Sequence, residues 1–237
     1  MASPQSTSIL GADHPSPHLG ALAIVFTVLF CVGLLPVTAF GGRPYFPGPW
    51  ESAQTIAAFF QARPSVVVLC AFLQFGSAIP LGIFTASIVS RLEFFGVRAA
   101  GPRIADFGGL ATTYMMMSNA AALWGMAHPS VALDIPLTVA LHHLSFALGG
   151  PGYSVPFGLL MAGISVPLLF RPLVPRWIPI LGLLLAVCGE LSWLSLKFQQ
   201  ATFLIPLTRF PGFIWIIAVG FALPSRIPQP AARQVRA

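Results

Sequence analysis

The sequence predicts an all-α, polytopic transmembrane helical bundle with six net crossings and one helix broken by glycine and proline. The chain of 237 residues is 56% hydrophobic and only 8% charged, with a mean hydropathy of +0.84, whereas soluble domains carry about 25% charged residues. Its apolar runs are continuous over about 20 residues, the length of a membrane helix. They lack the apolar–polar alternation of a β-barrel. We therefore expect the backbone N–H and C=O groups to form their hydrogen bonds within helices.

The N-terminal part of the chain predicts a tail followed by a first membrane helix. Residues 1–18 are polar, rich in Ser and Pro and free of Lys and Arg, which indicates a flexible tail. The apolar run of residues 19–40 follows. It lacks the basic n-region and the shorter h-region of a signal peptide, although residues 37–39 would make a weak cleavage site, so we expect a retained helix.

A short amphipathic segment separates the first two membrane runs. After a Gly/Pro loop at residues 41–50, residues 51–61 place Ile56, Phe59 and Phe60 at helical spacing. The segment is too short to cross a bilayer, and we expect it to lie at the membrane interface.

Two further apolar runs, residues 65–89 and 104–127, predict the second and third membrane helices. The loop between them carries Arg91, Arg98 and Arg103. A basic loop of this kind indicates the cytoplasmic side of a membrane protein.

The fourth apolar region, residues 131–170, is too long for one straight crossing. A continuous helix of this length would measure about 60 Å at 1.5 Å per residue, roughly twice the hydrocarbon thickness. Residues 149–152 read Gly-Gly-Pro-Gly and predict a break in the helix. The region therefore makes either two crossings with a tight turn or one crossing with a bent or re-entrant segment.

Two more runs complete the predicted bundle of residues 19–224. They cover residues 177–196 and 201–223, and the second is interrupted by Pro206 and Pro211. Residues 225–237 are basic and predict a cytoplasmic C-terminal tail.

The distribution of basic residues favours six crossings over seven. If the fourth region crosses once and the loop of residues 91–103 lies inside, eight of the 12 Lys and Arg residues lie on the cytoplasmic side. Both termini are then cytoplasmic, and the other four basic residues lie outside or within the membrane. Seven crossings are possible but would split this bias, against the positive-inside rule.

The net charge of +6 fits a membrane surface better than nucleic acid. The basic residues lie mostly between apolar runs, and no basic patch with interleaved aromatic residues is present. We therefore expect the lipid bilayer as the main partner, with anionic lipid headgroups at the cytoplasmic face. A membrane protein partner or a second copy of the chain stays open.

Glu190 and Arg209 are the strongest candidate functional residues, because ionisable groups within membrane helices are costly and often functional. Counting 1.5 Å per residue from the turn that contains Lys197 places both at similar depth on neighbouring antiparallel helices. This predicts an ion pair, which either fixes helix register or takes part in function. Gly182 and Ala186 precede Glu190 at intervals of four, so this face should approach another helix closely.

The same topology brings Gln74, Asn119, Glu190 and Arg209 into the outer half of the bilayer. They predict one polar pocket that opens outward, or else private hydrogen bonds between helices. His142 and His143 are further candidates for ligand binding because they can titrate near neutral pH. Adjacent residues on a helix point about 100° apart, however, so one packed and one interfacial histidine is the simpler interpretation.

Neither catalysis, a cofactor nor a metal site is indicated. The sequence contains no P-loop, no G-x-S-x-G and no H-E-x-x-H motif. Cys31, Cys70 and Cys188 lie within apolar runs without C-x-x-C spacing, and residues 115–117, three consecutive methionines, point in different directions around a helix.

Four segments resemble a group of uncharacterised bacterial multi-pass integral membrane proteins with six to seven helices. They are residues 94–105 (FFGVRAAGPRIA), 142–160 (HHLSFALGGPGYSVPFGLL), 175–192 (PRWIPILGLLLAVCGELS) and 207–224 (LTRFPGFIWIIAVGFALP). The resemblance covers a little over half of the chain. It implies a helical bundle in the plasma (inner) membrane and assigns no activity to any residue.

The sequence leads to two hypotheses of function. In the first, the protein binds or transports a small molecule through the outward-facing pocket. In the second, it is a non-catalytic accessory or sensor protein that acts through protein partners. Convergence of Gln74, Asn119, Glu190 and Arg209 on one cavity would favour the first hypothesis.

Overall fold

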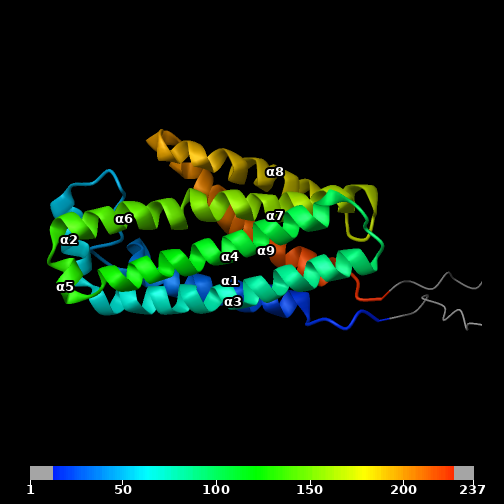
Figure 1. Ribbon diagram of the computed structural model, residues 1–237, viewed down its shortest axis with the longest axis horizontal. Coiled ribbons are helices and arrows are strands. Elements are labelled where there is room, and N and C mark those ends of the chain that lie inside the picture. Colours follow the sequence, from blue (N-terminus) through cyan, green and yellow to red (C-terminus); the bar gives the residue numbers. More distant parts are fainter. Residues whose placement is uncertain (1–12, 227–237) are drawn as a thin grey trace, which may run out of the picture.

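The computed structural model describes residues 13–226, which fold into a bundle of long helices (Figure 1). Within this range there are helices and short 3₁₀ turns but no β-strand, which confirms the predicted all-α fold. Five helical segments are long and apolar enough to cross a membrane and indicate a membrane protein: Leu19–Val37, Pro64–Phe94, Ile135–Phe170, Trp177–Leu196 and Gln199–Ala222. Most of the two predicted tails, residues 1–18 and 225–237, lies outside the described residues.

The first helix is α1 (Leu19–Leu34), which continues into two 3₁₀ turns, η1 (Leu35–Val37) and η2 (Ala39–Gly41). The His18 ring accepts a hydrogen bond from the Ala21 N–H (3.1 Å) and so caps the helix start. The first apolar run thus begins where the sequence predicts and unwinds before its end.

The predicted amphipathic segment forms α2 (Ala53–Ala62). The Ser52 hydroxyl accepts a hydrogen bond from the Thr55 N–H (3.2 Å), a typical N-cap. Its buried residues include Ile56, Phe59 and Phe60, as their spacing predicts, and it packs against α6.

The next two long helices are α3 (Pro64–Phe94) and α4 (Ala100–Met126). Pro64 occupies the first turn of α3, where its missing N–H does no harm. The third predicted membrane run lies in α4, a helix of 27 residues. However, α4 is not among the five segments that are both long and apolar enough to cross a membrane. Arg103 and Asp106, together with its glycine and hydroxyl residues, make α4 more polar than the others.

The long fourth region forms a short helix α5 (Pro129–Ala132), then α6 (Ile135–Gly149) and α7 (Pro151–Phe170). The break falls at Gly150, within the predicted interruption. Both α6 and α7 lie along α4, one after the other (Figure 1). The region therefore makes one pass along the bundle with a break, and not two antiparallel passes.

The last two passes are α8 (Trp177–Leu191), extended by η3 (Ser192–Leu196), and α9 (Leu204–Ala222), preceded by η4 (Gln199–Phe203). The two helices are packed against each other and joined by these 3₁₀ turns. Figure 1 shows α8 at an angle to the other long helices.

Both ends of the described chain lie at the same end of the bundle (Figure 1). Arg91, near the end of α3, donates a hydrogen bond to the Leu223 carbonyl after α9 (3.2 Å). Arg171, after α7, donates to the Phe95 carbonyl after α3 (2.7 Å). Arg91, Arg171 and Arg226 thus gather at this end, which we call the terminal end.

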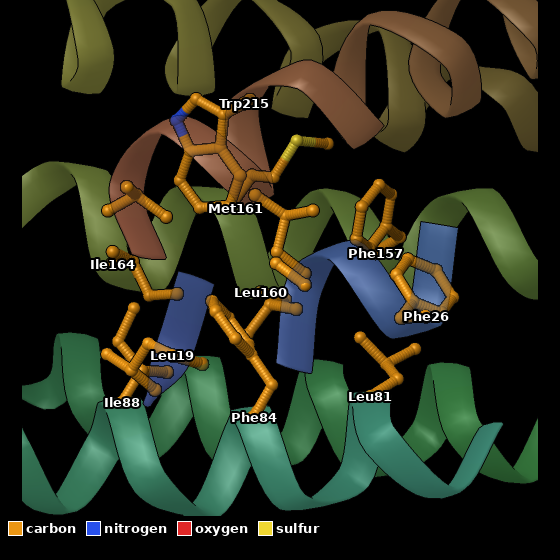
Figure 2. Packing of buried hydrophobic residues seen from close by; sticks show 14 of the residues in the cluster. Leu19, Phe26, Leu81, Phe84, Ile88, Phe157, Leu160, Met161, Ile164 and Trp215 are labelled. Atoms are coloured by element: carbon orange, nitrogen blue, oxygen red, sulfur yellow. The ribbon is translucent and has the colours of Figure 1, made fainter. Parts of the chain in front are cut away.

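One hydrophobic core lies toward the terminal end (Figure 2). It joins α1, α3, α7 and α9 through side chains such as Phe26, Phe84, Phe157 and Trp215, all fully buried. The indole N–H of Trp215 donates to the Ile178 carbonyl of α8 (2.9 Å), so its polar atom is also satisfied.

A second hydrophobic cluster fills the opposite end, which we call the distal end. It combines the apolar face of α2 with the start of α3 and the end of α4, and includes Val37, Phe59, Phe60, Val67 and Leu123. The space between the two clusters is where the candidate site lies.

Glycines bring α7 close to its neighbours on two sides. A side chain at Gly163 would meet the backbone of Gly101 and Ala105 in α4, and one at Gly158 would lie 3.0 Å from the Ala186 carbonyl of α8. The prediction that the Gly182–Ala186 face approaches another helix closely is therefore confirmed.

Candidate functional site

A cavity of about 300 Å³ lies between the two hydrophobic clusters, in the distal half of the bundle. This volume is at the lower end of the range for small-molecule pockets, about 300–1,000 Å³. Its wall is mainly apolar. The apolar lining residues include Phe30, Leu34, Val37, Phe46, Val67, Cys70, Met116, Leu123, Phe146 and Ile205.

Three of the polar residues singled out in the sequence meet at this cavity: Gln74 from α3, Asn119 from α4 and Arg209 from α9. They are separated by 45 to 135 positions in the sequence and come from three different helices. Gln74 is 5% exposed and Asn119 is 8% exposed, so both are reached mainly through the cavity. The similar depth in the bilayer that the sequence predicts for Gln74, Asn119 and Arg209 thus agrees with their position around one cavity.

Arg209 is held between two aromatic rings. Its guanidinium carbon lies 4.7 Å from the ring centre of Tyr153 and 5.3 Å from that of Phe30, within cation–π range. Its Nη2 donates a hydrogen bond to the Gly149 carbonyl, while its Nε has no partner among the described residues. These contacts fix the plane of the guanidinium and leave part of its donor capacity unused.

The break between α6 and α7 supplies the carbonyl that Arg209 binds. In a continuous helix, the Gly149 carbonyl would accept from the N–H of Tyr153 four residues later. At the break, the Gly150 N–H donates to the Phe146 carbonyl and the Ser154 N–H to the Gly150 carbonyl, but no bond joins the Tyr153 N–H to the Gly149 carbonyl among the described residues. The Gly149 carbonyl is therefore free to accept from the side chain of Arg209. A backbone irregularity of this kind is tolerated at membrane depth where it lines a cavity.

The remaining polar groups of the cavity are only partly satisfied. Ser145 donates to the Oδ1 of Asn119 (2.6 Å), which orients the amide with its Nδ2 still unpaired within the described chain. The side chain of Gln74 forms no hydrogen bond with any described residue, and the Tyr153 hydroxyl, in a residue only 1% exposed, has none either. The amide of Gln74 and the Nδ2 of Asn119 are therefore the groups open to a guest, whereas the Tyr153 hydroxyl is covered by its neighbours.

A loop closes over the distal end of the cavity and contributes Thr38 and Phe46 to its wall. Arg63, between α2 and α3, holds this loop by donating to the carbonyls of Gly41 (2.9 Å), Gly42 (3.1 Å) and Pro44 (3.0 Å). This role of Arg63 is not visible in the sequence, because the acceptors are backbone groups.

Glu190 is not part of the cavity, and the predicted Glu190–Arg209 ion pair is absent. The ion pairs among the described residues are Arg103–Glu93 and Arg226–Asp13. Glu190 instead faces α7, where its Oε1 lies 3.2 Å from the position that a Cβ of Gly158 would occupy. The prediction was wrong because the direction of Glu190 around α8 turns it to a different neighbour.

His142 and His143 do not line the cavity either. His142 is fully buried against the rings of Phe46 (5.1 Å) and Phe60 (5.9 Å), behind the closing loop, while His143 is exposed. The two histidines therefore take the packed and the interfacial positions that adjacency on a helix allows.

No metal centre is formed by the described residues, among which no group of three or more His, Cys, Asp or Glu side chains could hold an ion. The three cysteines are free, and Cys70 lines the cavity. Of the three consecutive methionines, Met116 is the buried one that packs in the core.

The terminal end has a second, more polar cavity of about 450 Å³ between residues 13–19 and 220–226. Arg91 crosses it and donates to the Ser16 hydroxyl (2.6 Å) and to the Leu223 carbonyl. His14 contacts the Ser90 hydroxyl (3.1 Å) in the same place. Burial, and secondly the nearby charge of Arg91, lower the pKa of His14 below its ordinary value of 6.5.

Tyr153, Ser145 and the Gly149 carbonyl complete the site but were not identified from the sequence as site residues. The break at residues 149–152 was the available signal, since a freed backbone group at membrane depth needs a partner. Comparisons with protein-family models, with curated proteins and with solved structures found no match to this chain. The function is therefore inferred from the geometry of the cavity and the charges around it.

Proposed function

We propose that this chain is a multi-pass protein of the plasma (inner) membrane that binds a small molecule in its distal cavity, as a carrier or as a binding protein. In this proposal the chain crosses the bilayer six times, both termini and the terminal end face the cytoplasm, and the cavity opens toward the outside. The cytoplasmic side is in contact with anionic lipid headgroups.

The orientation is supported by the charges at the two ends of the bundle. Arg91, Arg171 and Arg226 lie at the terminal end together with the start of α4, and basic residues favour the cytoplasmic side. The distal end is formed by α2 and by the loop that contributes Thr38 and Phe46 to the cavity wall.

Binding of a small molecule is supported by one observation above all, the convergence of Gln74, Asn119 and Arg209 on a single cavity. Each of these side chains is costly within a membrane helix. If they served only to join helices, they would be expected to pair with one another or with neighbouring backbone. Asn119 and Arg209 each make one such bond, with Ser145 and with the Gly149 carbonyl. The side chain of Gln74, in contrast, has no partner within the described residues.

The topology is tested by single cysteines placed at Arg98, Arg171 and Thr38 in a background with the three native cysteines replaced by serine. A membrane-impermeant maleimide applied outside should label position 38 and leave 98 and 171 unlabelled until the membrane is opened. Labelling of positions 98 and 171 from opposite sides would overturn the six-crossing arrangement.

The binding itself is tested with a neutral photoreactive probe, an eight-carbon alcohol that carries a diazirine, on the full chain in nanodiscs. We expect saturable labelling of cavity residues such as Met116 and Phe146. A bulky Cys70→Phe substitution in the cavity wall should abolish it, and the same change at Cys188, which lies outside the cavity, should not.

Unsaturable labelling, spread over the lipid-facing surface, would refute a binding cavity. It would favour the alternative of an accessory or sensor protein that acts through partners.

A further inference from the structure

We infer that the molecule taken up by the distal cavity is a small amphiphilic monoanion, a medium-chain carboxylic acid whose carboxylate binds Arg209 and whose hydrocarbon tail lies along the apolar wall. This inference rests on the proposed binding function and names the class of its ligand. It follows from the charge, the hydrogen-bonding groups and the shape of the cavity.

The guanidinium of Arg209 has no carboxylate partner among residues 13–226. The chain contains six acidic residues, and the structure describes all of them. Glu93 and Asp13 are paired with other arginines. Glu51 and Asp134 accept backbone N–H groups at a turn and at a helix start. Asp106 lies near the start of α4, and Glu190 faces α7.

The groups that do contact Arg209 are all uncharged. They are the rings of Phe30 and Tyr153 and the carbonyl of Gly149. A charged side chain at membrane depth costs about 2.5–3.5 kcal/mol even on the mildest scales, and such residues normally pair with an opposite charge. An anion brought by a ligand would complete this site.

The neighbouring polar groups suit an acceptor. The amide nitrogens of Gln74 and Asn119 can each donate, and an ionised carboxylate accepts only. The Oδ1 of Asn119 is already occupied by Ser145 (2.6 Å), which directs the remaining capacity of this amide toward donation. The guanidinium of Arg209 uses its Nη2 for the Gly149 carbonyl, and its Nη1 has no hydrogen bond within the described residues, so it also keeps a donor for the carboxylate.

The number of charges restricts the anion to a single negative charge. Arg209 is the one cationic side chain of the cavity among the described residues. A phosphate monoester, with a charge of about −1.5 to −2 at neutral pH, would leave excess negative charge in an apolar environment. A carboxylate balances Arg209 one to one.

The rest of the wall suits a hydrocarbon tail. From the polar group the cavity extends toward the distal end between apolar side chains such as Leu34, Val67 and Leu123. With about 300 Å³ available, a single medium-length chain fits, whereas a phospholipid with two full acyl chains does not. Apolar burial favours the tail by about 0.8 kcal/mol per CH₂.

The inference is tested by competition for the photoreactive alcohol in nanodiscs. Octanoate, octanol and octylamine have the same tail length and differ in charge, while palmitate and a short-chain phosphatidylglycerol test chain length and a lipid phosphate as the source of the anion. We expect octanoate to compete at least about tenfold better than octanol, and octylamine not to compete.

The role of Arg209 is tested with Arg209→Gln, which should reduce the apparent affinity for octanoate by about tenfold to a hundredfold and that for octanol much less, so that the preference for octanoate is lost. Lys197→Gln, which removes a positive charge at the same end of the bundle but outside the cavity, is the control and should change neither. If Arg209→Gln does not fold, Arg209→Lys should keep the preference for octanoate over octanol.

The possible outcomes separate this inference from the proposed function. Equal competition by octanoate and octanol would leave the cavity as a binding site and overturn the anion. Preference for the phosphatidylglycerol over octanoate would replace the carboxylate with a lipid phosphate. Absence of saturable labelling in the wild-type protein would instead refute the binding function itself.

Discussion

The contact between the backbones of α4 and α7 at Gly163 gives a quantitative stability prediction. At Gly163 of α7, an added Cβ would lie 2.4 Å from the backbone nitrogen of Ala105 and 2.6 Å from the carbonyl oxygen of Gly101 in α4. Both neighbours are backbone atoms, so no side chain can rotate away. Ordinary contact begins at 3.4 Å, so Gly163→Ala must separate α4 and α7 by about 1 Å.

The expected effect is a destabilisation that a matched glycine does not show. Gly125→Ala, in α4, adds its Cβ to open space with nothing within 4 Å. Both substitutions gain the same helix propensity, up to about 1 kcal/mol, so their difference isolates packing. Overpacking typically costs about 1–3 kcal/mol, and a gap of about 0.5–1 Å forfeits about a quarter to a half of the dispersion energy of each contact.

The assay is reversible unfolding by sodium dodecyl sulfate in mixed micelles, followed by circular dichroism. Gly163→Ala should be less stable than Gly125→Ala by about 1–3 kcal/mol. Equal stability of the two variants would refute the reasoning, because it would mean that α4 and α7 do not meet through backbone at Gly163.

Three further predictions concern the loop, the N-terminal segment and the core. Arg63→Gln removes the donors that hold three carbonyls of the loop at residues 41–48, so the rate of hydrogen–deuterium exchange in this loop should rise. An unchanged rate would show that Arg63 does not hold the loop. Because burial and Arg91 lower the pKa of His14 below 6.5, the docked segment holds a neutral ring, and acidification from pH 6.5 to about pH 5 should release it; protection from exchange that persists at low pH would contradict this. Trp215→Phe removes the indole donor of a buried hydrogen bond to the Ile178 carbonyl and should cost about 0.5–1.5 kcal/mol in the same detergent titration, whereas a variant of unchanged stability would contradict a contribution of this bond.

Much of the fold follows from sequence because membrane helices depend on length and hydrophobicity. The runs beginning at Leu19 and Trp177 start helices there, and Gly-Gly-Pro-Gly breaks a helix as expected. Hydropathy alone would miss α4 as a long helix of the bundle, because Arg103 and Asp106 near its start and buried polar residues such as Asn119 lower its average hydropathy.

The site was predictable in depth but not in direction. Counting 1.5 Å per residue correctly groups Gln74, Asn119 and Arg209. It could not reveal that Glu190 faces Gly158 on another side of α8, since the angle around a helix depends on which neighbours it packs against. Nor could it find the carbonyl that binds Arg209, because a backbone acceptor leaves no trace in the pattern of side chains.

The interruption at Gly150 also has an electrostatic consequence for Arg209. The negative end of α6 at Gly149 is followed within two residues by the positive end of α7 at Pro151, so the two helix macrodipoles largely cancel at the break. The guanidinium therefore meets the local dipole of one freed carbonyl, that of Gly149. An uninterrupted helix would have used this carbonyl for its own hydrogen bond. The break thus gives the arginine one acceptor without an opposing charge, and the cavity keeps a positive potential.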